Sequence, residues 1–144
     1  MTRDADDAAL TPLRYALVAV GIVFVVGIFV LMRVWPAGWQ WQPAQAEYEL
    51  MIVGVYATLG VFLLLAARDP LEHLSLIWFT VWSSVVHGGI MLVQALMDPA
   101  EQGHLVGDVP ALLLVALLLG WLTRRAQRQA SSKGAPQARA APGG

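Results

Sequence analysis

The sequence of 144 residues contains no cysteine and few charged residues. Without cysteine the chain has no disulfide, no thiolate metal ligand and no nucleophilic thiol. Charged residues make up 13% and hydrophobic residues 58%, against about 25% and 45–50% in soluble domains. So short a chain cannot bury this much apolar surface in water, and a bilayer removes the difficulty by acting as the solvent. The composition therefore predicts an integral membrane protein.

Motifs of several common chemistries are also missing. The sequence has no phosphate-binding glycine-rich loop, no nucleophile elbow and no His-Glu-x-x-His metal motif. It has no folded basic surface of the kind that binds nucleic acid. We therefore expect no metal site and no nucleic-acid partner, and the sequence leans against an enzyme.

Four apolar segments are long enough to cross a bilayer as helices, which takes about 20 residues each. The predicted spans are approximately residues 12–34, 48–67, 73–97 and 105–123. None of them alternates in polarity as the strands of a membrane β-barrel do. The predicted fold is an all-α four-helix bundle over residues 12–123, in contact with the lipid bilayer. Residues 1–11 and the basic tail, residues 124–144, are predicted to be disordered.

The distribution of basic residues predicts the orientation of the bundle. Eight basic residues lie in the two termini and in the loop between the second and third spans: Arg3, Arg14, Arg68, Arg124, Arg125, Arg128, Lys133 and Arg139. Only Arg33 lies on the other side. Since loops rich in Lys and Arg stay in the cytoplasm, both termini are expected to be cytoplasmic.

The loop that follows the first span contains Trp35, Trp39 and Trp41 among Pro36, Gly38 and Pro43. Amphipathic indole rings favour the headgroup layer, and proline and glycine oppose a regular helix. We expect a short interfacial segment here rather than a free loop.

The third span has a polar face. Thr80, Ser83, Ser84, His87 and Gly88 follow the spacing of one side of a helix. Because polar groups are costly in lipid, this face is expected to point into the bundle. An apolar set is expected to lie on the opposite face: Ile77, Phe79, Val81, Val85 and Met91.

Three further residues are expected near the level of His87 in the outer half of the bundle. With a rise of about 1.5 Å per residue, Tyr56 of the second span reaches a depth similar to that of His87. Glu49 lies just inside the outer boundary, and Asp108 lies near the outer end of the fourth span. The candidate polar cluster is Glu49, Tyr56, Ser83, Ser84, His87 and Asp108.

Each of these residues also has a structural interpretation. Asp108 fits a helix N-cap, with Pro110 in the first turn, and Glu49 fits a solvated position at the headgroups. Tyr56 fits a packed aromatic ring whose hydroxyl bonds to another helix. Ser83 and Ser84 fit hydroxyls that bond to their own helix or allow close helix approach. His87 suits a structural and a functional role equally.

Pairs of small residues four positions apart favour close approach between membrane helices. Ser84 with Gly88 and Gly54 with Thr58 are such pairs, and we expect both to lie in helix contacts. Gly103 and Gly107 have the same spacing before the fourth span, where they are expected to form a turn.

Several segments together resemble a family of small bacterial four-span membrane proteins of unknown function. They are MIVGVYA at 51–57, ARDP at 67–70, WFTVWSSVVHGG at 78–89 and GDVP at 107–110. The resemblance covers about residues 12–123 and implies a multi-pass protein of the bacterial inner membrane, but no activity. The layout is also similar to that of DoxX-like proteins, some of which are linked to quinone-dependent redox chemistry, and this is an analogy of fold alone.

Three functions fit the sequence. The first is a non-catalytic accessory or scaffold protein with a membrane protein partner or a homo-oligomer, since catalytic motifs are missing. The second is a binding or redox module for a lipophilic ligand such as a quinone, which would use the polar cluster and the nearby Trp82. The third is an oligomeric transporter of a small solute or proton. No other cofactor is predicted.

Overall fold

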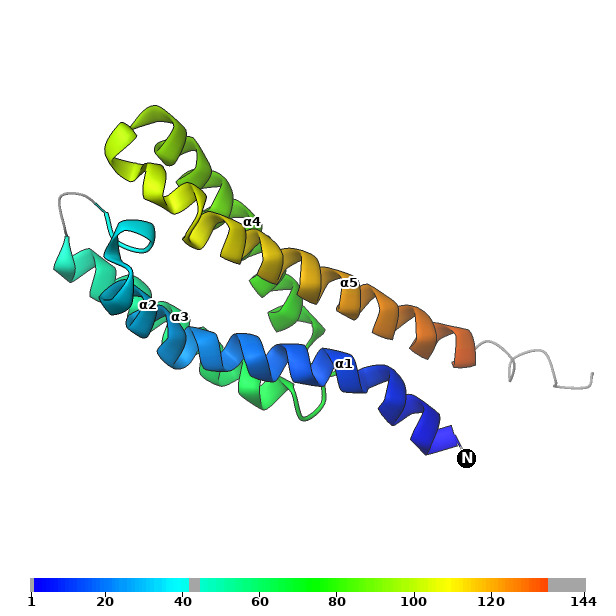
Figure 1. The fold of residues 1–144 in the computed structure, drawn as a ribbon. Helices are drawn as coiled ribbons and strands as arrows, with labels where there is room; N and C mark the ends of the chain where they lie inside the picture. Colours follow the sequence, from blue (N-terminus) through cyan, green and yellow to red (C-terminus); the bar gives the residue numbers. More distant parts are fainter. Residues whose placement is uncertain (1, 42–44, 135–144) are drawn as a thin grey trace, which may run out of the picture.

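The structure, a computed structural model, describes residues 2–41 and 45–134. Every regular element in this part of the chain is helical. The elements in order are α1 (Thr2–Ile22), the π-helical turn η1 (Val23–Gly27), α2 (Ile28–Val34), the 3-10 turn η2 (Pro36–Gly38), α3 (Ala46–Ala66), α4 (Leu74–Met97), the 3-10 turn η3 (Pro99–Leu105) and α5 (Asp108–Gly134). Together α1, η1 and α2 form one rod (Figure 1).

Four helical segments are long and apolar enough to cross a membrane, which confirms the predicted all-α membrane bundle. They are Leu10–Val34, Glu47–Ala66, Leu74–Met97 and Pro99–Ser132. Large apolar side chains such as Tyr15, Phe79 and Leu117 are exposed on the outside of the bundle. Surface of this kind is unfavourable in water and suits contact with lipid.

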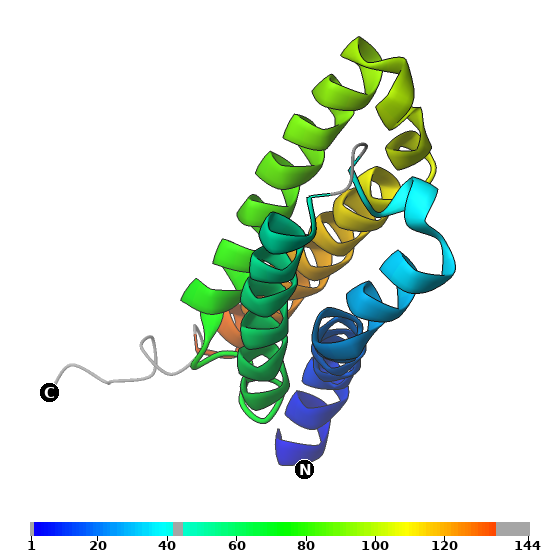
Figure 2. The same ribbon diagram turned by 90° about the vertical axis from the view of Figure 1, so that its left-hand side faces the viewer.

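The helices form two pairs, α1 with α3 and α4 with α5, and α3 contacts α4 only slightly. The pairs meet near the start of α1 and separate toward the connections at residues 35–45 and 98–107 (Figures 1 and 2). We call the first end the terminal end and the second the loop end. This divergence leaves room for a site between the pairs at the loop end.

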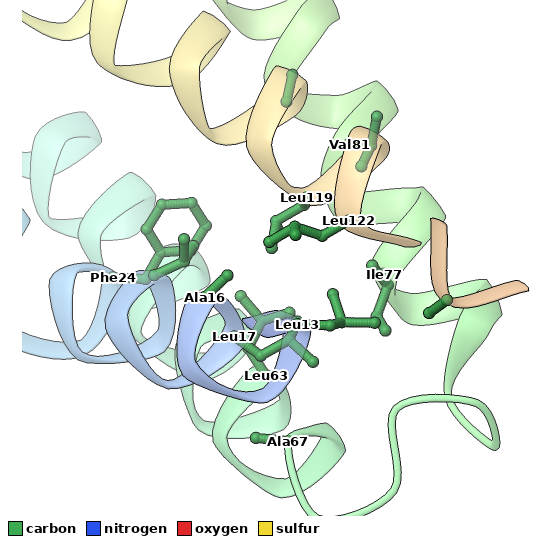
Figure 3. Packing of buried hydrophobic residues seen from close by; sticks show 13 residues of the cluster. Leu13, Ala16, Leu17, Phe24, Leu63, Ala67, Ile77, Val81, Leu119 and Leu122 are labelled. Carbon is green, nitrogen blue, oxygen red and sulfur yellow. The ribbon is translucent and has the colours of Figure 1, made fainter. Parts of the chain in front are cut away.

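The apolar core lies toward the terminal end, where all four helices meet (Figure 3). Leu13 and Leu17 of α1 pack with Leu63 of α3, Ile77 of α4 and Leu119 of α5, all fully buried. Leu13 and Leu17 lie one helical turn apart, so they share one face of α1. This core holds the two helix pairs together at the terminal end. At the loop end, other contacts hold them.

The closest approach between α1 and α3 is made by two glycines. A Cβ atom on Gly60 would lie 2.7 Å from the carbonyl oxygen of Gly21, and one on Gly21 would lie 3.0 Å from that of Gly60. Of the pairs predicted from spacing, Gly88 does lie near Leu112 of α5. The prediction for Gly54 and Thr58 was wrong within this chain, because a Cβ atom on Gly54 would have no neighbour from another helix within 4 Å and both residues are exposed.

At the loop end, η3 and the start of α5 pack on η2. A Cβ atom on Gly103 would overlap the carbonyl group of Ala37, and one on Gly107 would overlap that of Gly38. These two glycines therefore allow a backbone contact between distant segments, beyond the local turn that the sequence indicated. The contact closes the loop end over the space between the helix pairs.

Both ends of the described chain are more helical than predicted. The first helix begins at Thr2, inside the segment 1–11 that was expected to be disordered, and α5 continues to Gly134, inside 124–144. Alanine, glutamine and arginine favour helix, and Ala126 is buried against the core. Residues 135–144 of the predicted tail lie outside the described residues.

The buried face of α4 differs in part from the predicted one. Thr80, Ser84 and Gly88 are buried as expected. Ile77, Val81 and Met91 were assigned to the opposite face, and this was wrong: all three are buried. Ile77 precedes Thr80 by three residues and Met91 follows Gly88 by three, so they belong to the same stripe.

Candidate functional site

A hydrogen bond joins the two central helices of the site. The hydroxyl oxygen of Tyr56 on α3 lies 2.7 Å from Nδ1 of His87 on α4. Phe24 meets the Tyr56 ring edge-on, with ring centroids 4.8 Å apart. Phe24 belongs to the π-helical turn η1, and such turns are frequent at functional sites. The turn thus contributes to the position of Tyr56.

A cavity of about 60 Å³, the inner pocket, lies on the loop-end side of this pair. Its polar wall consists of Glu49, Tyr56, His87, His104 and Asp108. Its other lining residues are Ile28, Met32, Trp39, Trp41, Ile52, Val53, Met91 and Leu112. A cavity of this size has room for ordered water or for the polar end of a larger molecule.

A buried histidine lies between two carboxyl groups on the loop-end wall of the inner pocket. Nδ1 of His104 is 2.8 Å from Oδ2 of Asp108, and Nε2 is 3.0 Å from Oε2 of Glu101. The side chain of His104 is 2% exposed, and those of Glu101 and Asp108 are 10% and 13% exposed. An imidazole so placed can donate at one nitrogen and accept at the other. The geometry thus links both carboxyl groups through one ring.

Three polar atoms of pocket-lining residues have no hydrogen-bond partner among the described residues. They are Nε1 of Trp39, Oδ1 of Asp108 and Nε2 of His104, which lies 3.0 Å from Oε2 of Glu101 without the geometry of a hydrogen bond. Buried polar atoms of native proteins are nearly always hydrogen-bonded to protein, water or ligand. The Asp108 carboxylate also interacts electrostatically with His87. These atoms give the pocket the capacity to hold a polar group.

Glu49 has a different environment from the solvated headgroup position that was one prediction for it. The residue is 6% exposed and lines the inner pocket. Its Oε1 atom accepts a hydrogen bond from the backbone N–H of Gln45, at 3.3 Å, in the first turn of α3. Glu49 therefore supports its own helix start and presents a carboxyl group to the pocket.

An apolar groove of about 570 Å³, the side groove, runs between α3 and α4 on the outside of the bundle. Tyr56, His87, Ile52, Met91 and Trp41 line both the inner pocket and the side groove. Most of the remaining groove lining is apolar: Tyr48, Met51, Val55, Leu59, Phe79, Ser83, Val86, Ile90 and Gln94. The Tyr56–His87 pair therefore lies at the boundary between the inner pocket, which has polar groups on one wall, and an outer surface that faces lipid.

The predicted cluster is brought together only in part. Glu49, Tyr56, His87 and Asp108 surround the inner pocket. Ser83 lines the side groove, where its hydroxyl donates to the Thr80 carbonyl at 3.2 Å. Ser84 is buried but lines neither cavity, so both serines fit the structural interpretation. Trp82, which directly precedes Ser83, is 60% exposed and also lines neither cavity.

His104 and Glu101, which precede the predicted fourth span at 105–123, were not predicted as site residues from the sequence. Their spacing with Asp108, Glu101-x-x-His104-x-x-x-Asp108, is that of one helical face and was the available signal. The tryptophans predicted to lie at the headgroups, Trp39 and Trp41, also line the inner pocket. Among the described residues, no group of three or more His, Asp and Glu side chains is arranged to hold a metal ion.

Comparison with known proteins gives one match. A model described as a family of unknown function (DUF6632) covers residues 8–140, which agrees with the resemblance drawn from the segments around Tyr56, His87 and Asp108. Searches of curated proteins and of solved structures give no significant match. The likeness of layout to DoxX-like proteins stays a prediction.

Proposed function

Since the chain belongs to the DUF6632 family, whose function is unknown, we propose a function from its own geometry: the protein binds a lipophilic molecule with a polar head, such as a quinone. The observation that carries this proposal is the position of the Tyr56–His87 pair on the wall shared by the inner pocket and the side groove. A ligand could place its polar head at the pair and its apolar part in the groove.

The two cavities suit the two parts of such a ligand. Ligand sites for small molecules have volumes of roughly 300–1,000 Å³, with apolar walls and a few placed polar groups. The side groove of about 570 Å³ meets this description, while the inner pocket of about 60 Å³ is too small for a whole ligand. The groove also faces outward, so a hydrophobic molecule can enter from the lipid.

Tyr56 and His87 would form the hydrogen bonds with the polar head of the ligand. While Tyr56 and His87 are hydrogen-bonded to each other, the pair has one donor and one acceptor left for a ligand. The donor suits a carbonyl oxygen, as a quinone presents, and the acceptor suits a hydroxyl, as a quinol presents. Glu49 and Asp108 lie on the same pocket and can exchange protons with a bound head group. No described Lys or Arg side chain lines either cavity, so an anionic head group is disfavoured.

We place this site in a multi-pass protein of the bacterial inner membrane, with both termini in the cytoplasm. The support is the distribution of basic residues: eight lie in the two termini and the connection between the second and third spans, and one lies on the other side. Arg124 lies 5.5 Å from the Trp78 ring and Arg125 lies 5.7 Å from the Trp121 ring, arrangements that suit a membrane boundary at the terminal end. An accessory or scaffold role and an oligomeric transporter stay predictions, because no described contact favours either.

Binding of a benzoquinone with a ten-carbon tail to the chain in lipid nanodiscs tests the proposal, with quenching of tryptophan fluorescence as the signal. We expect saturable quenching, and an affinity about tenfold lower in His87→Ala, since a lost buried hydrogen bond is worth about 1.4 kcal/mol. His73→Ala is the matched control, because His73 is exposed and lines neither cavity. Linear, unsaturable quenching, or equal affinities in the two variants, would refute quinone binding.

A further inference from the structure

We infer that Glu101, His104 and Asp108 form a proton relay between water at the loop end and the inner pocket. The inference deepens the proposed function, since a site for a quinone needs proton exchange, but it is drawn from a different set of contacts. The relay has an entrance, a bridge and an exit.

The entrance is a surface hollow of about 370 Å³ at the loop end. Its lining contains three polar side chains, Gln45, Gln94 and Glu101, together with Trp41, Tyr48 and Ile52. Glu101 thus borders a polar hollow and also lies 3.0 Å from His104. A carboxyl group in this position can exchange protons with water on one side and with an imidazole on the other.

The bridge is the buried His104 ring, whose Nδ1 is hydrogen-bonded to Oδ2 of Asp108. Its Nε2 lies 3.0 Å from Oε2 of Glu101, where a rotation of the Glu101 carboxyl group aligns the two atoms for proton transfer. A proton moves from the Glu101 carboxyl group to Nε2 of His104, while the proton on Nδ1 moves to Oδ2 of Asp108. One O–H and one N–H bond break, and one of each forms, so the ring stays neutral. The negative charge passes from Asp108 to Glu101. Asp108 passes its proton into the pocket and Glu101 takes up a proton from water. The ring is reset when Nε2 releases its proton to water and Nδ1 takes one up from water in the inner pocket, which His104 lines.

The exit is Asp108, which lines the inner pocket and interacts electrostatically with His87. Its Oδ1 atom has no hydrogen-bond partner among the described residues. The pocket of about 60 Å³ has room for a water molecule between Asp108 and His87. A proton on Asp108 therefore reaches the Tyr56–His87 pair within the pocket.

Other titratable groups also line the inner pocket and could offer competing routes for a proton. Glu49 and Tyr56 of α3 and His87 of α4 face the same pocket, and η2 contributes no titratable side chain. Glu49 accepts from the Gln45 backbone and does not line the surface hollow. The only described carboxyl group that lines the hollow is Glu101, so the route through His104 is the one that the geometry supports.

The test uses the three histidines of the chain, His73, His87 and His104, as nitrogen-15 labels for NMR in nanodiscs without added quinone. We expect the rate of proton exchange at the His87 ring to fall about tenfold or more in His104→Gln and in Glu101→Gln. The His73 signal, at the terminal end, should not change. Glu72→Gln is the matched control for the carboxyl change, because Glu72 is exposed beside His73.

An unchanged exchange rate at His87 in both relay variants overturns the relay. A variant counts as folded when its His73 signal is unaltered. If one of the two relay variants does not fold, the exchange rate at His87 in the other variant tests the relay. Quinone affinity is measured separately on the same proteins. Slow exchange without quinone binding supports the relay and refutes the proposed ligand, whereas quinone binding with unchanged exchange supports the ligand and refutes the relay.

Discussion

The hydroxyl group of Tyr56 and Nδ1 of His87, 2.7 Å apart, join α3 to α4, two helices that otherwise make little contact. The same two helices form the walls of the side groove. This hydrogen bond therefore contributes to the separation of the helices beside the groove.

Replacement of Tyr56 by phenylalanine removes the hydrogen bond and keeps the ring against Phe24. We expect a loss of stability of about 0.6 kcal/mol, the average for side-chain hydrogen bonds between membrane helices. Thermal unfolding in detergent measures it, with Tyr15→Phe as the control, since Tyr15 is 73% exposed. Equal midpoints for the two variants would mean that the bond contributes nothing to the contact.

The glycine contact between α1 and α3 gives a second prediction. Gly60→Ala places a methyl group 2.7 Å from the Gly21 carbonyl oxygen, so the helices must separate. We expect destabilisation of about 1–3 kcal/mol, the usual range for an overpacked site. Unfolding in detergent at increasing denaturant concentrations would measure this loss of stability.

Gly54 provides a control on the same helix. It lies less than two turns from Gly60, and a Cβ atom added to it would have no neighbour within 4 Å, so Gly54→Ala adds a methyl group in open space. We expect its stability to equal or exceed that of the natural chain, since alanine is the better helix former. Destabilisation of Gly54→Ala to the same extent as Gly60→Ala would point to a contact of Gly54 with another molecule.

A third prediction concerns the backbone contact that closes the loop end. Gly103→Ala puts a methyl group onto the Ala37 carbonyl and should push η3 away from η2. Trp39 lines the inner pocket beside η2, so we expect its indole to become more accessible to acrylamide. Quenching is measured in proteins with and without the additional substitution Trp39→Phe, and the difference gives the contribution of Trp39 to the fluorescence quenching. Gly89→Ala is the control, because Gly89 has open space around it, and matching quenching in both alanine variants would contradict the prediction.

The spans and the level of the polar residues could be predicted because both depend on local quantities. Length and apolarity identify a spanning helix, and the fixed rise per residue places Tyr56, His87 and Asp108 near one level. Hydropathy does not separate buried from lipid-facing side chains, because lipid is as apolar as the core. This is why Ile77 and Met91 were assigned to the wrong face of α4.

Contacts between distant segments could not be predicted from one sequence. His104 is buried because η3 packs on η2 through Gly103 and Gly107, and nothing local to residues 99–107 requires that contact. The π-helical turn at Val23–Gly27 also has no clear local signal among β-branched residues. The relay and the position of Phe24 therefore emerged only from the structure.

The fourth prediction is the orientation of the bundle, which decides the compartment with which Glu101 exchanges protons. The absence of cysteine lets a single introduced thiol report its own location. Asp69→Cys labels the connection between α3 and α4, and Gln102→Cys labels η3; both residues are exposed. From the distribution of basic residues, we expect a membrane-impermeant maleimide added to intact bacterial spheroplasts to label position 102 and not position 69.

Inverted membrane vesicles should give the opposite labelling pattern. If position 69 is labelled in spheroplasts and position 102 is not, the termini are outside and the relay opens to the cytoplasm. Labelling of both positions from one side would contradict the four-span topology itself, because α4 separates the two positions along the chain. The expected pattern places the relay entrance outside the cytoplasm, so the inner pocket would exchange protons with the external medium.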